Sequence, residues 1–175
     1  MNVREVIAVI HQMQIDAVID GYAIGGAVGA TFFLEPIATL DVDIFVSFRP
    51  EPGALIITPQ PIFDYLKARG CTMEGEYVMI AGWPVQFLPP TGPLVEEALR
   101  EAVTIDVDGV PGRVFRAEHL AAIALQTGRA KDKARVLQFH EAGILDEPRF
   151  QGILARHGLV EAWGKFERLF LRESS

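Results

Sequence analysis

Two stretches decide the fold of this chain, IGGAVG at residues 24–29 and TLDVDIFV at residues 39–46. The first ends a short apolar run and leads into residues 27–34, so it predicts a strand, a glycine turn and a helix. Around the second, residues 40–48 carry apolar side chains at every even position. Such alternation is typical of a strand that buries one face only.

The rest of the chain predicts a mixed order of elements that becomes helical toward its end. In sequence order, we expect a helix at 3–13, a helix at 62–69, strands at 77–80 and 85–88, a helix at 94–99, strands at 103–107 and 110–115, and helices at 117–127, 131–141, 148–157 and 159–171. Asp108 and Gly109 separate the last two strands, as in two-residue type I′ hairpin turns. We therefore expect an α+β fold, with one mixed sheet flanked by helices in residues 1–116 and an all-helical part in residues 117–175 that packs on it.

Composition excludes several classes of protein. Of 175 residues, 50% are hydrophobic and 22% are charged, as in packed globular domains. The net charge of −7 gives no global basic field, so any contact with nucleic acid must be local. Cys71 is the single cysteine, which excludes an intrachain disulfide and a multi-thiolate zinc site. No stretch approaches the roughly 18 apolar residues of a membrane span, so we expect a soluble cytoplasmic protein.

Asp41 and Asp43 are the first candidates for chemistry. On the open face of a strand their Cα atoms lie about 6.5 Å apart, so the two carboxylates repel each other. A divalent cation would satisfy both, and magnesium is often held by one or two carboxylates plus substrate phosphates. The alternative is a solvent-facing strand with two ordinary surface aspartates.

The glycine turn at Gly25 and Gly26 is the second candidate. Unpaired amides and the positive end of a helix can hold an anion at such a turn. The alternative is a tight connection between a strand and a helix. Together with Asp41 and Asp43, the turn predicts a site for the two ends of a metal–triphosphate complex.

Residues 129–135 form a local basic patch. Arg129, Lys131, Lys133 and Arg135, with one acidic residue, Asp132, give these seven residues a charge of +3. Arg129 and Lys131 are therefore candidates to reach phosphates or an acceptor. The alternative is a solvated helix start whose side chains face several directions. In that case Asp132 would cap the helix that follows.

Residues 24–29 and 39–46 resemble the opening motif of the nucleotidyltransferase fold. Residues 118–125 and 128–135 are similar to the helical region of AbiEii-type and related small bacterial nucleotidyltransferases, so the resemblance covers most of residues 20–142. It implies a Mg²⁺- or Mn²⁺-dependent enzyme that moves a nucleoside monophosphate from a nucleoside triphosphate to an RNA, protein or small-molecule hydroxyl. It also implies a two-gene toxin–antitoxin partnership as one biological setting.

The same resemblance implies roles for individual residues. Asp41 and Asp43 hold the metal, and from the basic patch we expect Lys131 to act with them in catalysis. The resemblance implies that Gly25 and Gly26 position the triphosphate, and we expect Thr39, Arg129 and Lys131 to bind the nucleotide as well.

Two positions depart from the family pattern. Gln86 stands where a third carboxylate is expected, and an amide can ligate a metal but cannot act as a base. Asp64, Glu74 and Glu76 are the candidates to replace that carboxylate. Ile37 stands where related toxins carry an arginine.

Alternative functions follow from these observations. The departures at Gln86 and Ile37 favour a degenerate nucleotide-binding or regulatory module without turnover. A dinucleotide-binding unit is a further alternative, although Ile24 occupies the first glycine position of its fingerprint. The four histidines, His11, His119, His140 and His157, show no ligand spacing and are expected to be structural or exposed, with a place near the site left open for His119.

Overall fold

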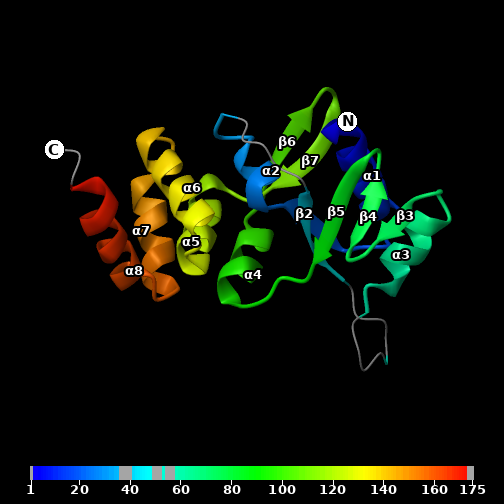
Figure 1. The fold of residues 1–175 in the computed structure, drawn as a ribbon. Coiled ribbons are helices and arrows are strands. Elements are labelled where there is room, and N and C mark those ends of the chain that lie inside the picture. Colours follow the sequence, from blue (N-terminus) through cyan, green and yellow to red (C-terminus); the bar gives the residue numbers. More distant parts are fainter. Residues whose placement is uncertain (1, 36–40, 49–52, 54–57, 173–175) are drawn as a thin grey trace.

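The computed structural model describes residues 2–35, 41–48, 53 and 58–172 (Figure 1). The strands are β1 (Gly21–Ile24), β2 (Val42–Ser47), β3 (Thr72–Glu74), β4 (Tyr77–Ile80), β5 (Trp83–Leu88), β6 (Val103–Val107) and β7 (Val110–Val114). The helices are α1 (Val3–Ile15), α2 (Gly26–Ala30), α3 (Gln60–Lys67), α4 (Pro93–Arg100), α5 (Ala117–Thr127), α6 (Ala130–Glu141), α7 (Glu147–Arg156) and α8 (Val160–Phe166), followed by a π-helical turn, Glu167–Leu171.

The strands form one mixed sheet in the order β3-β4-β5-β2-β1-β7-β6. The central strand, β2, runs antiparallel to β1 and parallel to β5, and β1 runs parallel to β7. The expected α+β fold is therefore confirmed. Both predicted hairpins form, β4 with β5 and β6 with β7, and the φ angles of Asp108 (51°) and Gly109 (80°) suit the predicted turn.

Three elements differ from the sequence prediction. The prediction missed β3, whose three exposed residues carry no alternation and pair with β4 alone. Helix α2 ends at Ala30 rather than at residue 34, because Phe32 and Phe33 donate to carbonyls three residues back and tighten the chain into turns. The last predicted helix changes to π-helical geometry after Phe166, which apolar spacing over a single turn cannot distinguish from an α-helix.

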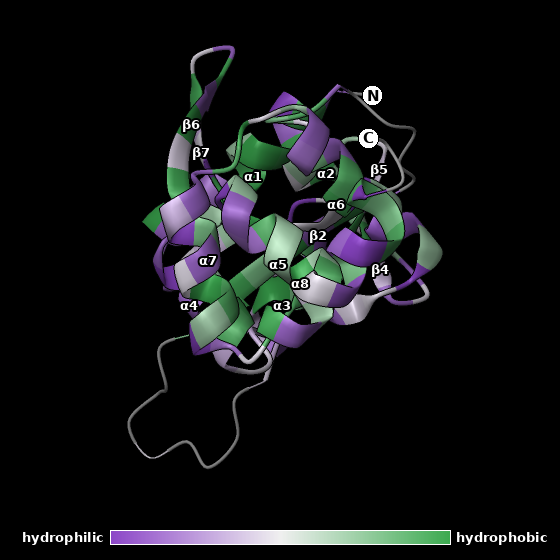
Figure 2. Cartoon of the chain, turned by 90° about the vertical axis from the view of Figure 1, so that its left-hand side faces the viewer, coloured by the Kyte–Doolittle hydropathy of each residue, from purple (hydrophilic) through white to green (hydrophobic). Residues whose placement is uncertain are grey.

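The two faces of the sheet bury two apolar clusters. Val42, Ile44 and Val46 of β2 point into a cluster completed by residues of α1 and α3. On the other face, Ala23 and Phe115 join a second cluster with α4 and α5 that continues through α6, α7 and α8. Figure 2 shows α5 in the middle of this helical layer, and eight of its eleven residues are buried. The second cluster joins the sheet to the helical part without a break. The predicted boundary at residue 116 stays a prediction.

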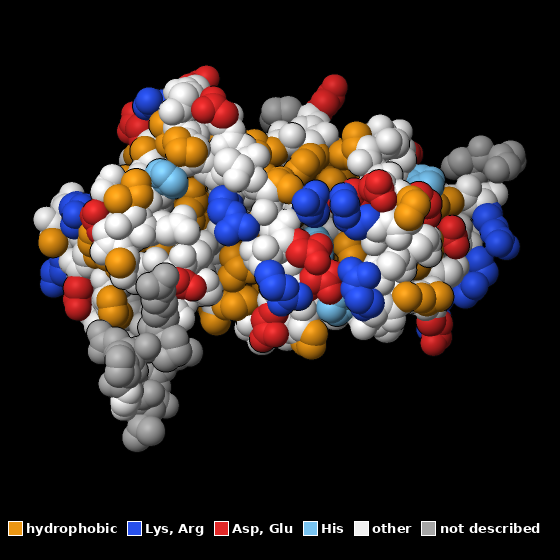
Figure 3. Space-filling model, turned by 180° about the vertical axis from the view of Figure 1, so that it is seen from behind, with side chains coloured by type: hydrophobic (Ala, Val, Ile, Leu, Met, Phe, Trp, Pro, Cys, Tyr) orange, Lys and Arg blue, Asp and Glu red, His pale blue; other side chains and the backbone are white. Residues whose placement is uncertain are grey.

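Every helix in the described part of the chain is too short or too polar to cross a lipid bilayer. The charges on the surface seen in Figure 3 are mixed, with acidic side chains near the middle of that face surrounded by lysine and arginine side chains. This face therefore presents no broad basic field.

Glu97 of α4 ties three helices together. Its carboxylate is 8% exposed and accepts hydrogen bonds from Arg156 (2.7 and 3.2 Å), from His119 Nε2 (3.0 Å) and from His157 Nε2 (2.8 Å). The hydrogen bonds from Arg156 hold the pKa of Glu97 well below its usual range, and burial lowers the pKa of His119. The group links α4 to α5 and to the end of α7, so it helps to hold the C-terminal helices against the sheet.

We expect Glu97→Gln to lower the free energy of unfolding by about 2 kcal/mol, because a neutral amide weakens the charge-assisted hydrogen bonds that Arg156, His119 and His157 make with the buried carboxylate. Urea denaturation measures the change. Glu96→Gln is the matched control on the exposed side of the same helix, and it should stay within about 0.5 kcal/mol of wild type. Equal stabilities of the two variants would contradict this role of Glu97.

The same variant has a defined pH dependence. A carboxylate with a lowered pKa stabilises the fold above the pKa of the unfolded chain, 4.5, and the contribution is lost as pH falls below that value. The difference between wild type and Glu97→Gln should therefore shrink as the pH falls through and below 4.5.

Candidate active site

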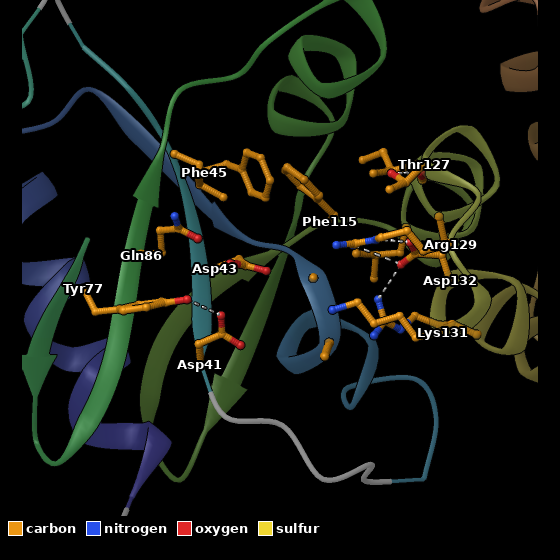
Figure 4. A pocket seen from close by; sticks show the side chains of 17 residues that line it. Asp41, Asp43, Phe45, Tyr77, Gln86, Phe115, Thr127, Arg129, Lys131 and Asp132 are labelled. Carbon is orange, nitrogen blue, oxygen red and sulfur yellow. Dashed lines mark hydrogen bonds and ion pairs between the residues drawn. The ribbon is translucent and has the colours of Figure 1, made fainter. Parts of the chain in front are cut away.

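A pocket of about 460 Å³ lies between the open face of the sheet and the helical layer (Figure 4). Its sheet side is formed by residues of β2, β4 and β5, and its helix side by residues of α2, α5 and α6. The charged residues that line it are Asp41, Asp43, Arg129, Lys131, Asp132 and Arg135. The pocket therefore joins the two sequence motifs that are about 90 residues apart along the chain.

Asp41 and Asp43 both line this pocket, as the alternation predicts. Burial raises the pKa of Asp43 above its usual range, and the negative charge of Asp41 raises it further, whereas Arg135, Lys131 and Arg129 act in the opposite direction. The pair thus carries an electrostatic cost that a bound cation would relieve.

The glycine turn packs directly on the second carboxylate. Gly25 caps α2 and donates its backbone N–H to the Asp43 carbonyl at 3.0 Å. Gly26 has a φ of 57°, and a Cβ added there would overlap the carboxylate of Asp43. A Cβ on Gly25 would overlap the ring of Phe45 in the same way. The two glycines therefore leave room for the side chains of β2, while their predicted contact with a triphosphate stays a prediction.

Three basic side chains face the carboxylates from the start of α6. Arg129 donates to both oxygens of Asp132, at 2.6 and 3.3 Å, and Arg135 lies 3.9 Å from the same carboxylate. Lys131 lines the pocket and, within the described chain, makes no ion pair. Arg129 itself is the N-cap residue of α6, so Asp132 does not cap this helix and instead holds two arginines from a buried position.

Gln86 stands beside Asp43, because β5 pairs with β2 in a register that aligns the two residues. Its side chain lines the pocket, where the resemblance placed a third carboxylate. Asp64, Glu74 and Glu76 do not line the pocket, so none of these proposed substitutes stands there. Among the described residues, the third carboxylate of the pocket is Asp132, which sequence reasoning had assigned to helix capping.

Tyr77 and two phenylalanines were not predicted as site residues. The Tyr77 side chain reaches across β5, and its hydroxyl lies 3.4 Å from Asp41 Oδ2 (Figure 4). The rings of Phe45 and Phe115 pack at an interplanar angle of 35°, with centroids 4.9 Å apart, and form an apolar wall with Leu120 and Ile123 of α5. The position of Phe45 follows from the alternation of β2, but nothing in the sequence shows which strands bring Tyr77 and Phe115 beside it.

His119 lies outside this pocket. It is fully buried between α4 and α5, and Glu97, Glu101 and His119 place one possible ligand atom each within 4.8 Å of one another. Glu97 is already bound by Arg156 and His157, so this group is accounted for by its internal ion pairs. Thr39 and Ile37, the remaining residues of interest, lie outside the described residues.

Comparison with solved structures identifies the fold as nucleotidyltransferase-like. The structure is similar to that of an antigenic nucleotidyltransferase-like protein from Paracoccidioides brasiliensis, with a TM-score of 0.67 and 16% identity over 98% of this chain and 89% of that one. A likeness to ANT(2'')-Ia in complex with adenylyl-2''-tobramycin has a TM-score of 0.48 and 14% identity over 85% of this chain and 95% of that one. No protein-family model and no curated protein matches the chain.

The first likeness confirms the fold that the motifs predict, and the AbiEii-type branch is not established by it. The mixed sheet also argues against a dinucleotide-binding unit. That unit needs parallel strands around its glycine turn, whereas β1 runs antiparallel to the next strand in sequence, β2.

We expect Gly26→Ala to destabilise the fold by at least about 1 kcal/mol more than Gly143→Ala. Both glycines have similar positive φ angles, 57° and 63°, but a Cβ on Gly143 meets nothing within 4 Å. The difference in urea denaturation therefore isolates the overlap with Asp43. In the double variant Gly26→Ala/Asp43→Ala, most of the extra loss in free energy of unfolding caused by Gly26→Ala should disappear. If the losses of the two single variants simply add, the contact between Gly26 and Asp43 is contradicted.

Proposed function

We propose that this protein is a metal-dependent nucleotidyltransferase that moves a nucleoside monophosphate from a nucleoside triphosphate to a hydroxyl of an RNA, a protein or a small molecule. The observation that carries the proposal is the pocket in which Asp41 and Asp43 face Arg129, Lys131 and Arg135. The nucleotidyltransferase-like fold supports it.

The residues of the pocket fit Mg²⁺ or Mn²⁺. Its potential ligands beside Asp41 and Asp43 are the amide oxygen of Gln86 and the hydroxyl of Tyr77, and oxygen donors suit these ions. The raised pKa of Asp43, to which the charge of Asp41 contributes, fits a cation bound by the two carboxylates. When bound, such an ion would neutralise charge on the α-phosphate and align the attacking hydroxyl.

The basic side of the pocket suits the phosphates. Lys131 would pair first with the triphosphate, since Arg129 and Arg135 are already engaged by Asp132 and supply positive potential from fixed positions. These cations would stabilise the charge that develops on the departing pyrophosphate.

The apolar side of the pocket suits the nucleoside. Phe45 and Phe115 provide flat aromatic surface on one side, and Leu120, Ile123 and Ala124 of α5 complete it. A volume of about 460 Å³ is within the range of small-molecule sites. The pocket thus combines a charged end with an apolar end, as a nucleoside triphosphate requires.

A nucleotide-binding module without turnover is the second candidate. Gln86 favours it, because this amide brings no negative charge beside Asp43, and Asp132 is occupied by two arginines. The assignment to the AbiEii-type branch, a toxin–antitoxin partnership and a cytoplasmic location rest on the sequence and its resemblance.

Transfer of label from α-labelled nucleoside triphosphates tests the proposal. Purified protein with Mg²⁺ or Mn²⁺, and with total cell RNA and protein as acceptors, should transfer label, and the double variant Asp41→Asn/Asp43→Asn should lose at least about 100-fold in rate. Chelation of the metal should abolish transfer. Metal-dependent nucleotide binding without any transfer would instead support the module without turnover.

We expect Lys131→Ala to weaken binding of a magnesium–nucleoside triphosphate complex about 10-fold or more, because a charge-assisted contact to phosphate is lost. Lys133→Ala is the matched control, since Lys133 is exposed on the same helix but does not line the pocket. Isothermal titration calorimetry with a non-hydrolysable triphosphate measures both affinities. Equal losses in the two variants would show that only the general charge of α6 matters.

A further inference from the structure

Tyr77 places a hydroxyl inside the proposed reaction site. It lies at the start of β4, and its ring crosses the neighbouring strand β5 to bring Oη to 3.4 Å from Asp41 Oδ2 (Figure 4). The cations of α6 lie on the opposite side of the pocket. A triphosphate held between Asp41 and these cations would therefore have the phenol of Tyr77 on its sheet side.

The other tyrosines of the chain have different surroundings. The chain has three tyrosines, all of them described. Tyr22 is fully buried in the core, and the hydroxyl of Tyr65 donates to Asp16 at 2.6 Å, away from the pocket. Thr127 is the other hydroxyl that lines the pocket, and it donates to the carbonyl of Ile123 at 2.9 Å. Tyr77 is thus the hydroxyl of the described pocket that lies next to Asp41, a carboxylate that would hold the metal under the proposed function.

We infer that Tyr77 is an internal acceptor, and that the protein transfers a nucleoside monophosphate from a nucleoside triphosphate to its own Tyr77 hydroxyl. The inference rests on the proposed function. In this step the bond between Tyr77 Oη and the α-phosphorus forms, the bond from that phosphorus to the bridging oxygen breaks, and pyrophosphate leaves. The proton of the phenol is released to water, so the triphosphate is the only co-reactant.

Tethering favours this acceptor over a free one. A hydroxyl held beside the reacting group acts at a high effective concentration, because its translational and rotational freedom is already lost. The product would also remain in the pocket as a phosphodiester on Tyr77, where it would obstruct the charged end that binds triphosphate. The modification is therefore expected to stop at one nucleotide per chain and to lower the affinity for a further triphosphate.

The experiment uses the purified full chain with each α-labelled nucleoside triphosphate and Mg²⁺ or Mn²⁺, without added acceptor. Label should remain with the denatured chain at no more than one per molecule, and peptide mass spectrometry should place it on Tyr77. Tyr77→Phe should lose at least about nine-tenths of the label, whereas the matched control Tyr65→Phe should retain it. Thermal melting of both variants checks that they fold.

Kinetics and the metal-site variant complete the test. The labelling rate per molecule should not change when the protein is diluted, since donor site and acceptor belong to one chain, and Asp41→Asn/Asp43→Asn should not be labelled. A rate that rises with protein concentration, label on another residue, or label that persists in Tyr77→Phe would overturn the inference.

Two further outcomes separate this inference from the proposed function. Transfer to added RNA or protein without label on Tyr77 would overturn the internal acceptor and leave the nucleotidyltransferase in place. Absence of any transfer would overturn both the internal acceptor and the nucleotidyltransferase, whether or not the preparation binds nucleotide.

Discussion

The one-sided burial of β2 is the constraint on which the rest of the site depends. Its position between β1 and β5 commits Val42, Ile44 and Val46 to the core. A slip of one residue would bury Asp43 and expose those apolar side chains, so the hydrophobic effect fixes the register of the strand. The same force that stabilises the core thereby places two carboxylates on the open face, although their mutual repulsion opposes that placement.

The opposite wall of the pocket depends on packing between helices. Glu97 binds α4 to α5 and α7, and the apolar cluster under these helices continues into α6. Within α6, the buried carboxylate of Asp132 contacts Arg129 and Arg135. These ion pairs offset the cost of removing its charge from water. The directions of Arg129 and Arg135 are therefore set by Asp132 rather than by Asp41 and Asp43, which they face across the pocket.

The sequence predicts the local parts of this site and misses those that depend on strand order. Alternation alone places Asp41 and Asp43, and the positive φ angles of Asp108 and Gly109 follow from their residue types. The contact of Tyr77 with Asp41 spans 36 positions, and that of Arg156 with Glu97 spans 59. Such contacts arise from β4 and β5 folding beside β2 and from helices packing together, which no periodicity of a single segment encodes.

The charge balance of the pocket bears on how many metal ions it can hold. Three carboxylates and three cations line its described walls, and Asp132 is used by two of those cations. Asp41 and Asp43 are the other two carboxylates, and Gln86 adds a neutral oxygen beside Asp43. Two negative charges balance one divalent ion, while a second would need the phosphates of the substrate. Under the proposed function, the site would then assemble fully only when the triphosphate is bound.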